Sequence, residues 1–331
     1  MNFLLTSIQR GVYSAGAWEK VGDHGWKNEV DAEAHLPVLP SEVLSWLRPG
    51  AGSIMLDCTV GYCGHARAIL ESSAPDGTVI GIDRDEAAIT SCKKRLERFG
   101  SRLVLIKGHF LDLKRHLADL GISKVNGVLF DLGVSSPQLD DPSRGFSFQT
   151  DGPLDMRMDQ TEETTAADIV NRMGEADLAN MIYEFGEERL SRRIARAIIR
   201  ARTRRPLETT RELVSAIEGA VPGSYRRGRI HFATRTFQAL RIAVNQELDH
   251  LASALCDAAD VLEPGGRLCV ISFHSLEDRI VKQTFRRLSG AQLTVLTKKP
   301  QLPTRDEMKS NPRSRSAKLR VGERHTESGH A

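Results

Sequence analysis

The stretch Leu56-Asp57-Cys58-Thr59-Val60-Gly61-Tyr62-Cys63-Gly64-His65-Ala66 is the strongest indicator of how this chain folds. It follows an apolar run and precedes a helix-like run, which predicts a strand, a tight glycine turn and the start of a helix. Such a turn lets backbone N–H groups approach a ligand closely. The next strand-like run ends at Asp83, nineteen positions after Gly64, where a carboxylate can accept hydrogen bonds from both hydroxyls of a ribose. The pattern favours a nucleoside-containing cofactor, although such glycines are often required for steric reasons alone.

Carboxylates end three of the strand-like runs, at Asp57, Asp83 and Asp131. The carboxyl ends of parallel strands meet at one edge of a sheet, and that edge is where open α/β sheets bind ligands. Alternating strands and helices predict a Rossmann-like, mostly parallel, doubly wound α/β sheet. The expected strands lie near 53–57, 78–82, 102–107 and 126–131, and the expected helices near 41–47, 65–73, 85–98 and 110–120.

The alternation stops after Asp131, and the next strand candidate is 267–272. This gap is far longer than an ordinary crossover, so we expect a helical insertion between the fourth and fifth strands. Its helices are expected near 164–172, 175–185, 187–203 and 209–219, followed by one long helix near 233–262. The predicted organisation is a flexible arm over 1–34, a cofactor domain over 35–134 and 236–297, the insertion over 135–235, and a flexible basic tail over 298–331.

Composition indicates an ordinary globular protein, with 331 residues, 40% hydrophobic residues and a net charge of +3. The five cysteines form no C-x-x-C pair, which favours a reducing compartment and no zinc site. No apolar stretch approaches the ~20 residues that span a bilayer, so no membrane partner is expected. A cytoplasmic location is predicted, with an organelle as the alternative if 1–34 is a transit peptide.

Arginines crowd the segment from Arg189 to Arg205, which carries eight of them and no acid. Helix faces exposed to solvent normally carry charges of both signs. A face that carries only positive guanidinium groups suits phosphate. We therefore favour nucleic acid over a plain solvated face, and add the basic loop after Tyr225. The predicted RNA-binding residues are Arg189, Arg192, Arg193, Arg196, Arg200, Arg226, Arg227 and Arg229.

Two runs are interpreted as helix caps. The first is Thr209-Thr210-Arg211-Glu212 and the second is Ser275-Leu276-Glu277-Asp278. His274, Glu277 and Asp278 resemble metal ligands in type, but no second cluster supports them, so capping is preferred and no metal is expected.

Several longer motifs resemble the ribosomal small-subunit RNA (cytosine-N4)-methyltransferase family, of the RsmH/MraW type. The resemblance runs in order from about His35 to Arg320. The motifs that carry it are Asp131-Leu132-Gly133-Val134-Ser135-Ser136-Pro137-Gln138-Leu139-Asp140, 144–148, 151–159, 186–189, 233–242 and 271–279.

The resemblance implies a class I methyltransferase fold, S-adenosylmethionine as cofactor, and a cytidine in the decoding region of small-subunit rRNA as substrate. A homodimer is one option for the assembly of this chain. The expected partner is small-subunit rRNA, either naked or within an assembling subunit. Three departures from the family pattern stand at Cys63 (for glycine), Ala66 (for serine) and His109. If position 63 needs a positive φ, cysteine strains the turn and weakens cofactor binding, while contacts through its backbone N–H remain. The implied cofactor contacts are Cys63, Gly64, His65, Asp83, Phe110, Asp131 and Gln138.

Methyl transfer to N4 requires a hydrogen-bond acceptor on the amino group, because the N4 lone pair is delocalised into the ring. We place Asp131 or the nearby Ser135 and Ser136 at the boundary between cofactor and base. Asp155 and Arg157 are further candidates on the base side, although Asp155 can equally pair with Arg157. No cysteine nucleophile sits in this loop, which favours nitrogen or oxygen as the methyl acceptor.

Two other functions stay open at this point. A nicotinamide-dependent oxidoreductase uses a similar sheet, but G-x-G-x-x-G is missing. A non-catalytic RNA-binding assembly factor with a nucleotide pocket is the other, and the Cys63 departure keeps it in consideration.

Overall fold

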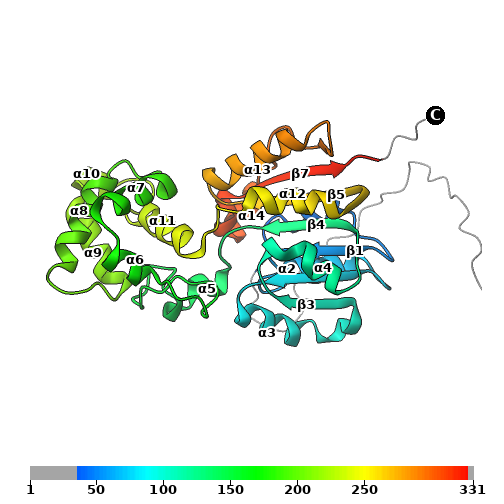
Figure 1. Cartoon of the computed structure of the whole chain (residues 1–331), viewed down its shortest axis with the longest axis horizontal. Coiled ribbons are helices and arrows are strands. Elements are labelled where there is room, and N and C mark those ends of the chain that lie inside the picture. The colour runs from blue at the N-terminus through cyan, green and yellow to red at the C-terminus, as the bar shows by residue number, and fades with distance from the viewer. Residues whose placement is uncertain (1–35, 327–331) are drawn as a thin grey trace, which may run out of the picture. The chain divides into compact units, whose positions relative to one another are not determined.

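A computed structural model describes residues 36–326 (Figure 1). The chain divides into the units Met1–Ala34 and His35–Ala331, and the predicted N-terminal arm lies outside the described residues. Within residues 36–326, no helix is both long enough and apolar enough to cross a bilayer.

Seven strands form one sheet in the order β3-β2-β1-β4-β5-β7-β6. Its first five strands are parallel neighbours, as predicted. The order reverses between β1 and β4, so the topological switch point lies where the chain leaves these two strands. The parallel strands are β1 (Ile54–Asp57), β2 (Thr78–Asp83), β3 (Leu103–Lys107), β4 (Val125–Asp131) and β5 (Leu262–Ser272).

Helices cover both faces of the sheet, which gives it two apolar layers. One face packs against α1 (Pro40–Leu47), α2 (Gly64–Ser72) and α3 (Glu86–Arg95). The other packs against α4 (Leu113–Asp119), α12 (Leu251–Val261) and α13 (Ser275–Leu288). Burial on both faces explains why the parallel strands read as continuous apolar runs. Short 3-10 turns also occur at η1 (Glu97–Arg102), η2 (Phe110–Asp112), η3 (Pro142–Arg144) and η4 (Pro312–Ser316).

The prediction of a flexible basic tail is wrong for residues 298–326. Strand β7 (Lys318–Arg324) pairs antiparallel with β5, and the short β6 (Leu293–Val295) pairs with β7. Between them lies α14 (Arg305–Ser310). Leu319 and Val321 are fully buried, and the buried Arg320 is neutralised by Asp278. Composition alone missed this alternation of apolar residues.

The expected helical insertion is present between β4 and β5 (Figure 1, green to yellow). It has its own apolar core, which includes Ile182, Ile194, Ile198 and Leu213. Its helices are α5 (Ser136–Asp140), α6 (Ala166–Arg172), α7 (Glu175–Gly186), α8 (Ser191–Arg202), α9 (Thr210–Ala220), α10 (Gly223–Arg226) and α11 (Thr234–Asn245).

The prediction of one long helix over 233–262 is also wrong. The chain forms α11 and α12 with a break between them, because Gln246 takes a left-handed conformation with φ 50°. The last residue of α11, Asn245, is buried and bonds to the backbone of Met156 and Met158. Asn245 therefore fixes α11 to the loop before α6, and Glu247, just after the break at Gln246, lines the cleft at the sheet edge.

Candidate active site

A cleft opens at the carboxyl edge of the sheet, at the switch point between β1 and β4. Its empty volume is about 1190 Å³, part of it open to solvent. The lining brings residues from the ends of β1 and β2 together with Asn245, Glu247, Phe273 and Glu277. The cleft thus connects the sheet edge with the segment after α11 and with the start of α13.

The glycine turn adopts the conformation that makes cysteine costly. Cys63 has φ 64° and ψ 25°, in the left-handed region, just before α2 begins. For a residue with a Cβ this conformation costs about 1–2 kcal/mol. The thiol is buried, and a hydrogen bond with the free thiol of Cys92 lowers the pKa of Cys63 below its ordinary value. The expected strain is therefore confirmed.

The expectation that the Cys63 backbone N–H stays available for the cofactor is wrong. That N–H donates to the carbonyl oxygen of Val60 at 2.8 Å, which closes the turn. The neighbouring Gly64 lines the cleft and lies so close to the Pro37 ring that a Cβ there would meet it at 3.1 Å. Of these three residues, Gly64 and His65 therefore line the cleft, and Cys63 does not.

Asp83 ends β2 and lines the cleft, where it is held by two backbone donors. Its Oδ2 accepts the N–H of Gly61 at 2.8 Å and its Oδ1 accepts the N–H of Asp85 at 2.9 Å. Each oxygen keeps a lone pair, which suits two ribose hydroxyls. Burial raises the pKa of this carboxyl to about 6, against the opposing effect of the two N–H groups.

Asp57 lies beneath the cleft and is 1% exposed. Burial raises its pKa to about 7, His65 opposes that shift, and Asp131 and Asp83 add to it. The three strand-end carboxylates therefore interact at one sheet edge, as the sequence predicted.

His65 and Asp131 both line the cleft and lie side by side, with Nε2 3.5 Å from Oδ2. The imidazole Nε2 and the Asp131 Oδ1 are buried without hydrogen-bond partners in the described part of the chain. Burial by itself would lower the pKa of His65, but Asp131 outweighs it and raises the pKa. Orphaned polar atoms at the cleft wall fit a polar ligand such as the charged end of S-adenosylmethionine.

Gln138 and Phe110 also line the cleft, in different ways. Gln138 Nε2 donates to Asp85 at 2.7 Å, and its Oε1 accepts the Ser135 N–H at 2.9 Å. It therefore locks the start of α5 to the start of α3. Phe110 packs edge-on against Phe130, 5.5 Å between centroids, and offers the cleft an apolar ring.

Asp155 is placed away from the cleft lining. Its two oxygens accept from the guanidinium of Arg157 at 2.9 and 2.7 Å. This geometry favours the pairing interpretation over a role on the substrate.

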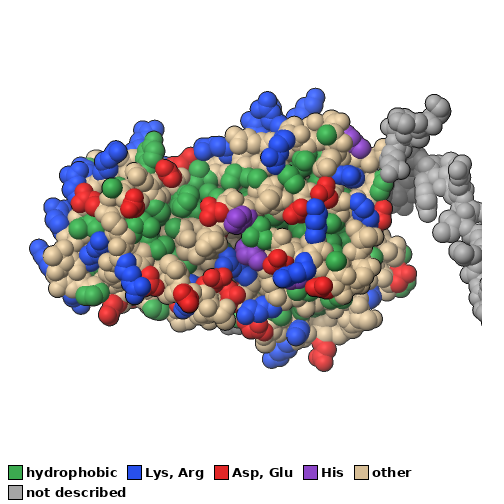
Figure 2. Space-filling model, viewed as in Figure 1, with side chains coloured by type: hydrophobic (Ala, Val, Ile, Leu, Met, Phe, Trp, Pro, Cys, Tyr) green, Lys and Arg blue, Asp and Glu red, His purple; other side chains and the backbone are tan. Residues whose placement is uncertain are grey.

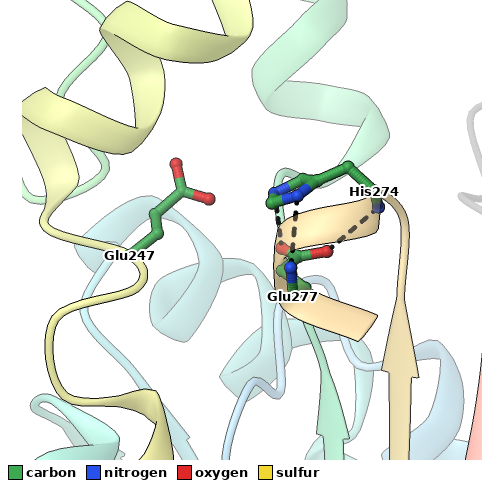
Figure 3. A group of neighbouring side chains, drawn as sticks. All are labelled: Glu247, His274 and Glu277. Carbon is green, nitrogen blue, oxygen red and sulfur yellow. Dashed lines mark hydrogen bonds and ion pairs between the residues drawn. The ribbon is translucent and has the colours of Figure 1, made fainter. Parts of the chain in front are cut away.

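Beside the cleft lies a group of residues that the sequence alone did not assign to a site. Figure 3 shows the Glu247 carboxylate facing His274 and Glu277. The predicted cap of α13 is shifted by one residue: His274, not Ser275, is the N-cap, and Glu277 completes the capping box. Glu247 belongs to no recognisable sequence motif. Its position depends on the helix break at Gln246, which the sequence did not reveal.

The predicted RNA-binding arginines are all exposed, and most lie on α8 and beside α10. Figure 2 shows Lys and Arg side chains gathered along that edge of the insertion. Tyr225 is not free for a base, because its hydroxyl donates to Glu188.

The parallel sheet, its switch-point cleft and the acid after β2 define a class I S-adenosylmethionine-dependent methyltransferase fold. Residues 32–325 match the family model of the MraW methylase family, and the chain belongs to that family.

Curated relatives agree with the family. The chain is 51% identical to the "Ribosomal RNA small subunit methyltransferase H" of Geotalea daltonii, over 88% of this chain and 98% of that one. It is 55% identical to the protein of the same name from Synechococcus elongatus, over 88% and 94%. A solved rRNA methylase from Streptococcus thermophilus aligns over 87% of this chain and 94% of that one, with 12% identity and a TM-score of 0.39, which adds nothing to the assignment.

Proposed function

We propose that this protein transfers the methyl group of S-adenosylmethionine to N4 of a cytidine in small-subunit rRNA. The observation that carries the proposal is the switch-point cleft, with Asp83 poised for a ribose, in a chain of the MraW methylase family. The relatives' printed names supply the small-subunit rRNA. N4 as the acceptor follows from the family resemblance.

The residues at the cofactor end divide the work of binding. Asp83 receives the ribose hydroxyls, and Phe110 covers an apolar surface of the cofactor. Gly64 permits close approach, while His65 and Asp131 supply polar atoms near the methionine part. When bound, S-adenosylmethionine supplies an activated methyl group on a sulfonium. Orientation of this group toward the base supplies much of the rate enhancement.

RNA is held, in this proposal, by the exposed arginines of α8 and the loop after α10. Arg192 and Arg193 make no ion pair within residues 36–326, whereas Arg196 lies 3.5 Å from Glu175 and Arg226 bonds to Glu218. Unpaired guanidinium groups have the lowest cost of transfer to phosphate.

Incubation of the purified protein with methyl-labelled S-adenosylmethionine and immature small subunits tests the proposal. Nucleoside analysis is expected to show the label in N4-methylcytidine. Cofactor binding with no transfer to rRNA would instead support an RNA-binding assembly factor. Free rRNA, run in parallel, identifies which form of the substrate is used.

Two finer points belong to the same proposal. We place the protein in the compartment of the small ribosomal subunits that it modifies, the cytoplasm or an organelle with its own ribosomes. A homodimer is one option for the assembly, and light scattering coupled to size-exclusion chromatography measures the oligomeric state.

A further inference from the structure

We infer that Glu247, His274 and Glu277 read the Watson–Crick edge of the target cytosine and receive the proton that N4 loses. The inference rests on the proposed function, and it assigns the base-binding end of the cleft.

The three side chains come from two separate parts of the chain and meet at one corner of the cleft. Glu247 follows the break after α11, whereas His274 and Glu277 begin α13 (Figure 3). One polar atom from each lies within 4.8 Å of the other two. Glu247 and Glu277 line the same cleft as Asp83 and Asp131. A base in this corner therefore shares one cavity with the cofactor.

Among the described residues, His274 Nε2 is a buried polar atom that lies beside the Glu277 carboxylate and makes no hydrogen bond. Its side chain is 9% exposed, and its Nε2 lies 3.2 Å from Glu277 Oε1 without making a hydrogen bond. The other ring nitrogen, Nδ1, accepts the N–H of Glu277 at 3.4 Å. A neutral imidazole that accepts at Nδ1 carries its proton at Nε2. The orphaned atom is therefore a donor.

This tautomer argues against a metal ion in the cluster. A metal-binding Nε2 must be unprotonated, with the proton on Nδ1, and here Nδ1 is already an acceptor. In addition, the Arg241 guanidinium grips Glu247 with two hydrogen bonds of 2.9 Å. Burial alone would lower the pKa of Arg241, but Glu247 and Glu277 raise it, so the cation stays in place. A second cation beside it is disfavoured.

The donor and acceptors match cytosine. Its N4 amino group has two N–H donors, and the adjacent N3 is an acceptor. An sp² amino group that donates two bonds of ~2.8 Å at about 120° places its acceptors roughly 4.9 Å apart. One carboxylate oxygen of Glu247 and one of Glu277 lie within 4.8 Å of each other, so both can reach a single amino group. The His274 Nε2–H beside them suits N3. Uracil presents a carbonyl oxygen in place of the amino group and an N3–H donor in place of the acceptor. Its oxygen would face carboxylate acceptors, and its N3–H would face the His274 donor.

The same groups serve the reaction. Two acceptors on the N4 hydrogens localise the nitrogen lone pair and direct it out of the ring plane, toward the methyl donor. The N4–carbon bond forms as the sulfur–methyl bond breaks, and the electron pair of that bond stays on sulfur. The methylated nitrogen carries a positive charge until one N4 proton passes to a carboxylate oxygen and then to water. Two carboxylates and one guanidinium leave the corner with a net negative charge, which stabilises that positive nitrogen.

Two variants test the inference while sparing the fold. Glu247→Gln keeps the shape and one acceptor for Arg241 but removes the negative charge. His274→Asn retains a capping oxygen for the Glu277 N–H and removes the imidazole ring with its Nε2–H. Glu263→Gln is the matched control, since that exposed carboxylate lies at the start of β5, away from the cleft lining.

Single-turnover transfer to small subunits is the measurement. We expect Glu247→Gln to lose about 100-fold in rate. His274→Asn should lose about 10-fold in apparent RNA affinity at saturating cofactor. S-adenosylmethionine affinity and melting temperature should stay within the range of the control. Full turnover in both variants would overturn the inference.

The two proposals fail in distinguishable ways. If the wild-type protein makes no N4-methylcytidine, the proposed function is wrong. If the wild type methylates and Glu247→Gln is equally fast, only the assignment of this corner is wrong. A Glu247→Gln defect accompanied by loss of cofactor affinity would also count against it, because it would place the residue on the cofactor.

Discussion

The sheet half and the helical insertion differ in how their charged side chains are held, and the proposed function gives each a different ligand. In the sheet half, a few buried carboxylates are fixed by backbone N–H groups, as Asp83 is by Gly61 and Asp85. In the insertion, an apolar core supports exposed arginines such as Arg192 and Arg193, which no side chain fixes in the described residues. Specific recognition of a small molecule needs the first arrangement, and attraction of an RNA backbone needs the second. Single substitutions should therefore have large effects in the first region and small ones in the second.

The largest effect is expected at Asp83. Asp83→Asn removes one acceptor and turns an N–H donor toward a backbone N–H, so S-adenosylmethionine affinity should fall about 100-fold, or about 3 kcal/mol. Isothermal titration calorimetry with the cofactor measures this. Asp119→Asn, an exposed carboxylate at the end of α4, is the control. Unchanged affinity in Asp83→Asn would mean that Asp83 does not contact the ribose. The expected difference between the sheet half and the insertion would then be smaller.

Asp57 should make the stability of the sheet half depend on pH. Its pKa is raised by burial to about 7, so the folded state binds a proton more tightly than the unfolded state, whose pKa is near 3.8. Stability from this group is present at low pH and is lost as pH rises toward 7. Asp57→Asn should therefore stabilise the protein relative to wild type by about 2–3 kcal/mol more at pH 8 than at pH 5.

Urea denaturation of both proteins at the two pH values measures this difference. Comparison with wild type at each pH cancels the titration of all other groups. An equal gain at pH 5 and pH 8 would mean that Asp57 is ionised at both values, contrary to the effect of its burial.

A smaller effect is expected where the insertion is held by local structure. Thr209 caps α9, and its hydroxyl accepts the N–H of Glu212 in a confirmed capping box. Thr209→Ala should lower the free energy of unfolding by about 1 kcal/mol, whereas Thr209→Ser keeps the hydroxyl and most of that stability. Chemical denaturation measures both. A loss of cofactor affinity in Thr209→Ala would show that the insertion and the sheet half are coupled, contrary to their separate roles.

The smallest effect per residue is expected for the exposed arginines. Arg192→Gln or Arg193→Gln alone should weaken RNA binding only a few-fold. Removal of one guanidinium–phosphate pair should reduce the slope of log affinity against log salt by about 0.7–0.9. Binding to small-subunit rRNA across a salt series measures this slope, with Arg115→Gln on α4 as the control. A variant that carries both Arg192→Gln and Arg193→Gln should show the larger change in slope. An unchanged slope in that variant would mean that RNA binds to another surface.

Elements of strong local pattern were predictable from the sequence. The parallel strands read as apolar runs because both their faces are buried, and their positions agree with the structure. The glycine turn and the acids Asp57, Asp83 and Asp131 were found because a parallel sheet brings strand ends to one edge. The Thr209 cap is equally local, since it depends on residues three apart.

Interactions between distant segments were not predictable in this way. Strand β7 reads as a basic tail until β5 supplies its backbone partners and Asp278 neutralises Arg320. The helix break at Gln246 depends on Asn245 reaching the backbone of residues 156 and 158. Cys63 was recognised as a departure, but only the turn shows that its N–H is already used by Val60.

The class of fold, the family resemblance and the acids at the strand ends beside the cleft all follow from the amino-acid sequence. These depend on short-range spacing and on one general rule for parallel sheets. The meeting of Glu247 with His274 and Glu277 follows from the three-dimensional packing instead, because that corner joins the end of α11 to the start of α13. Their separation in the chain leaves no periodic signal, and their common position exists only after the sheet and the insertion have packed.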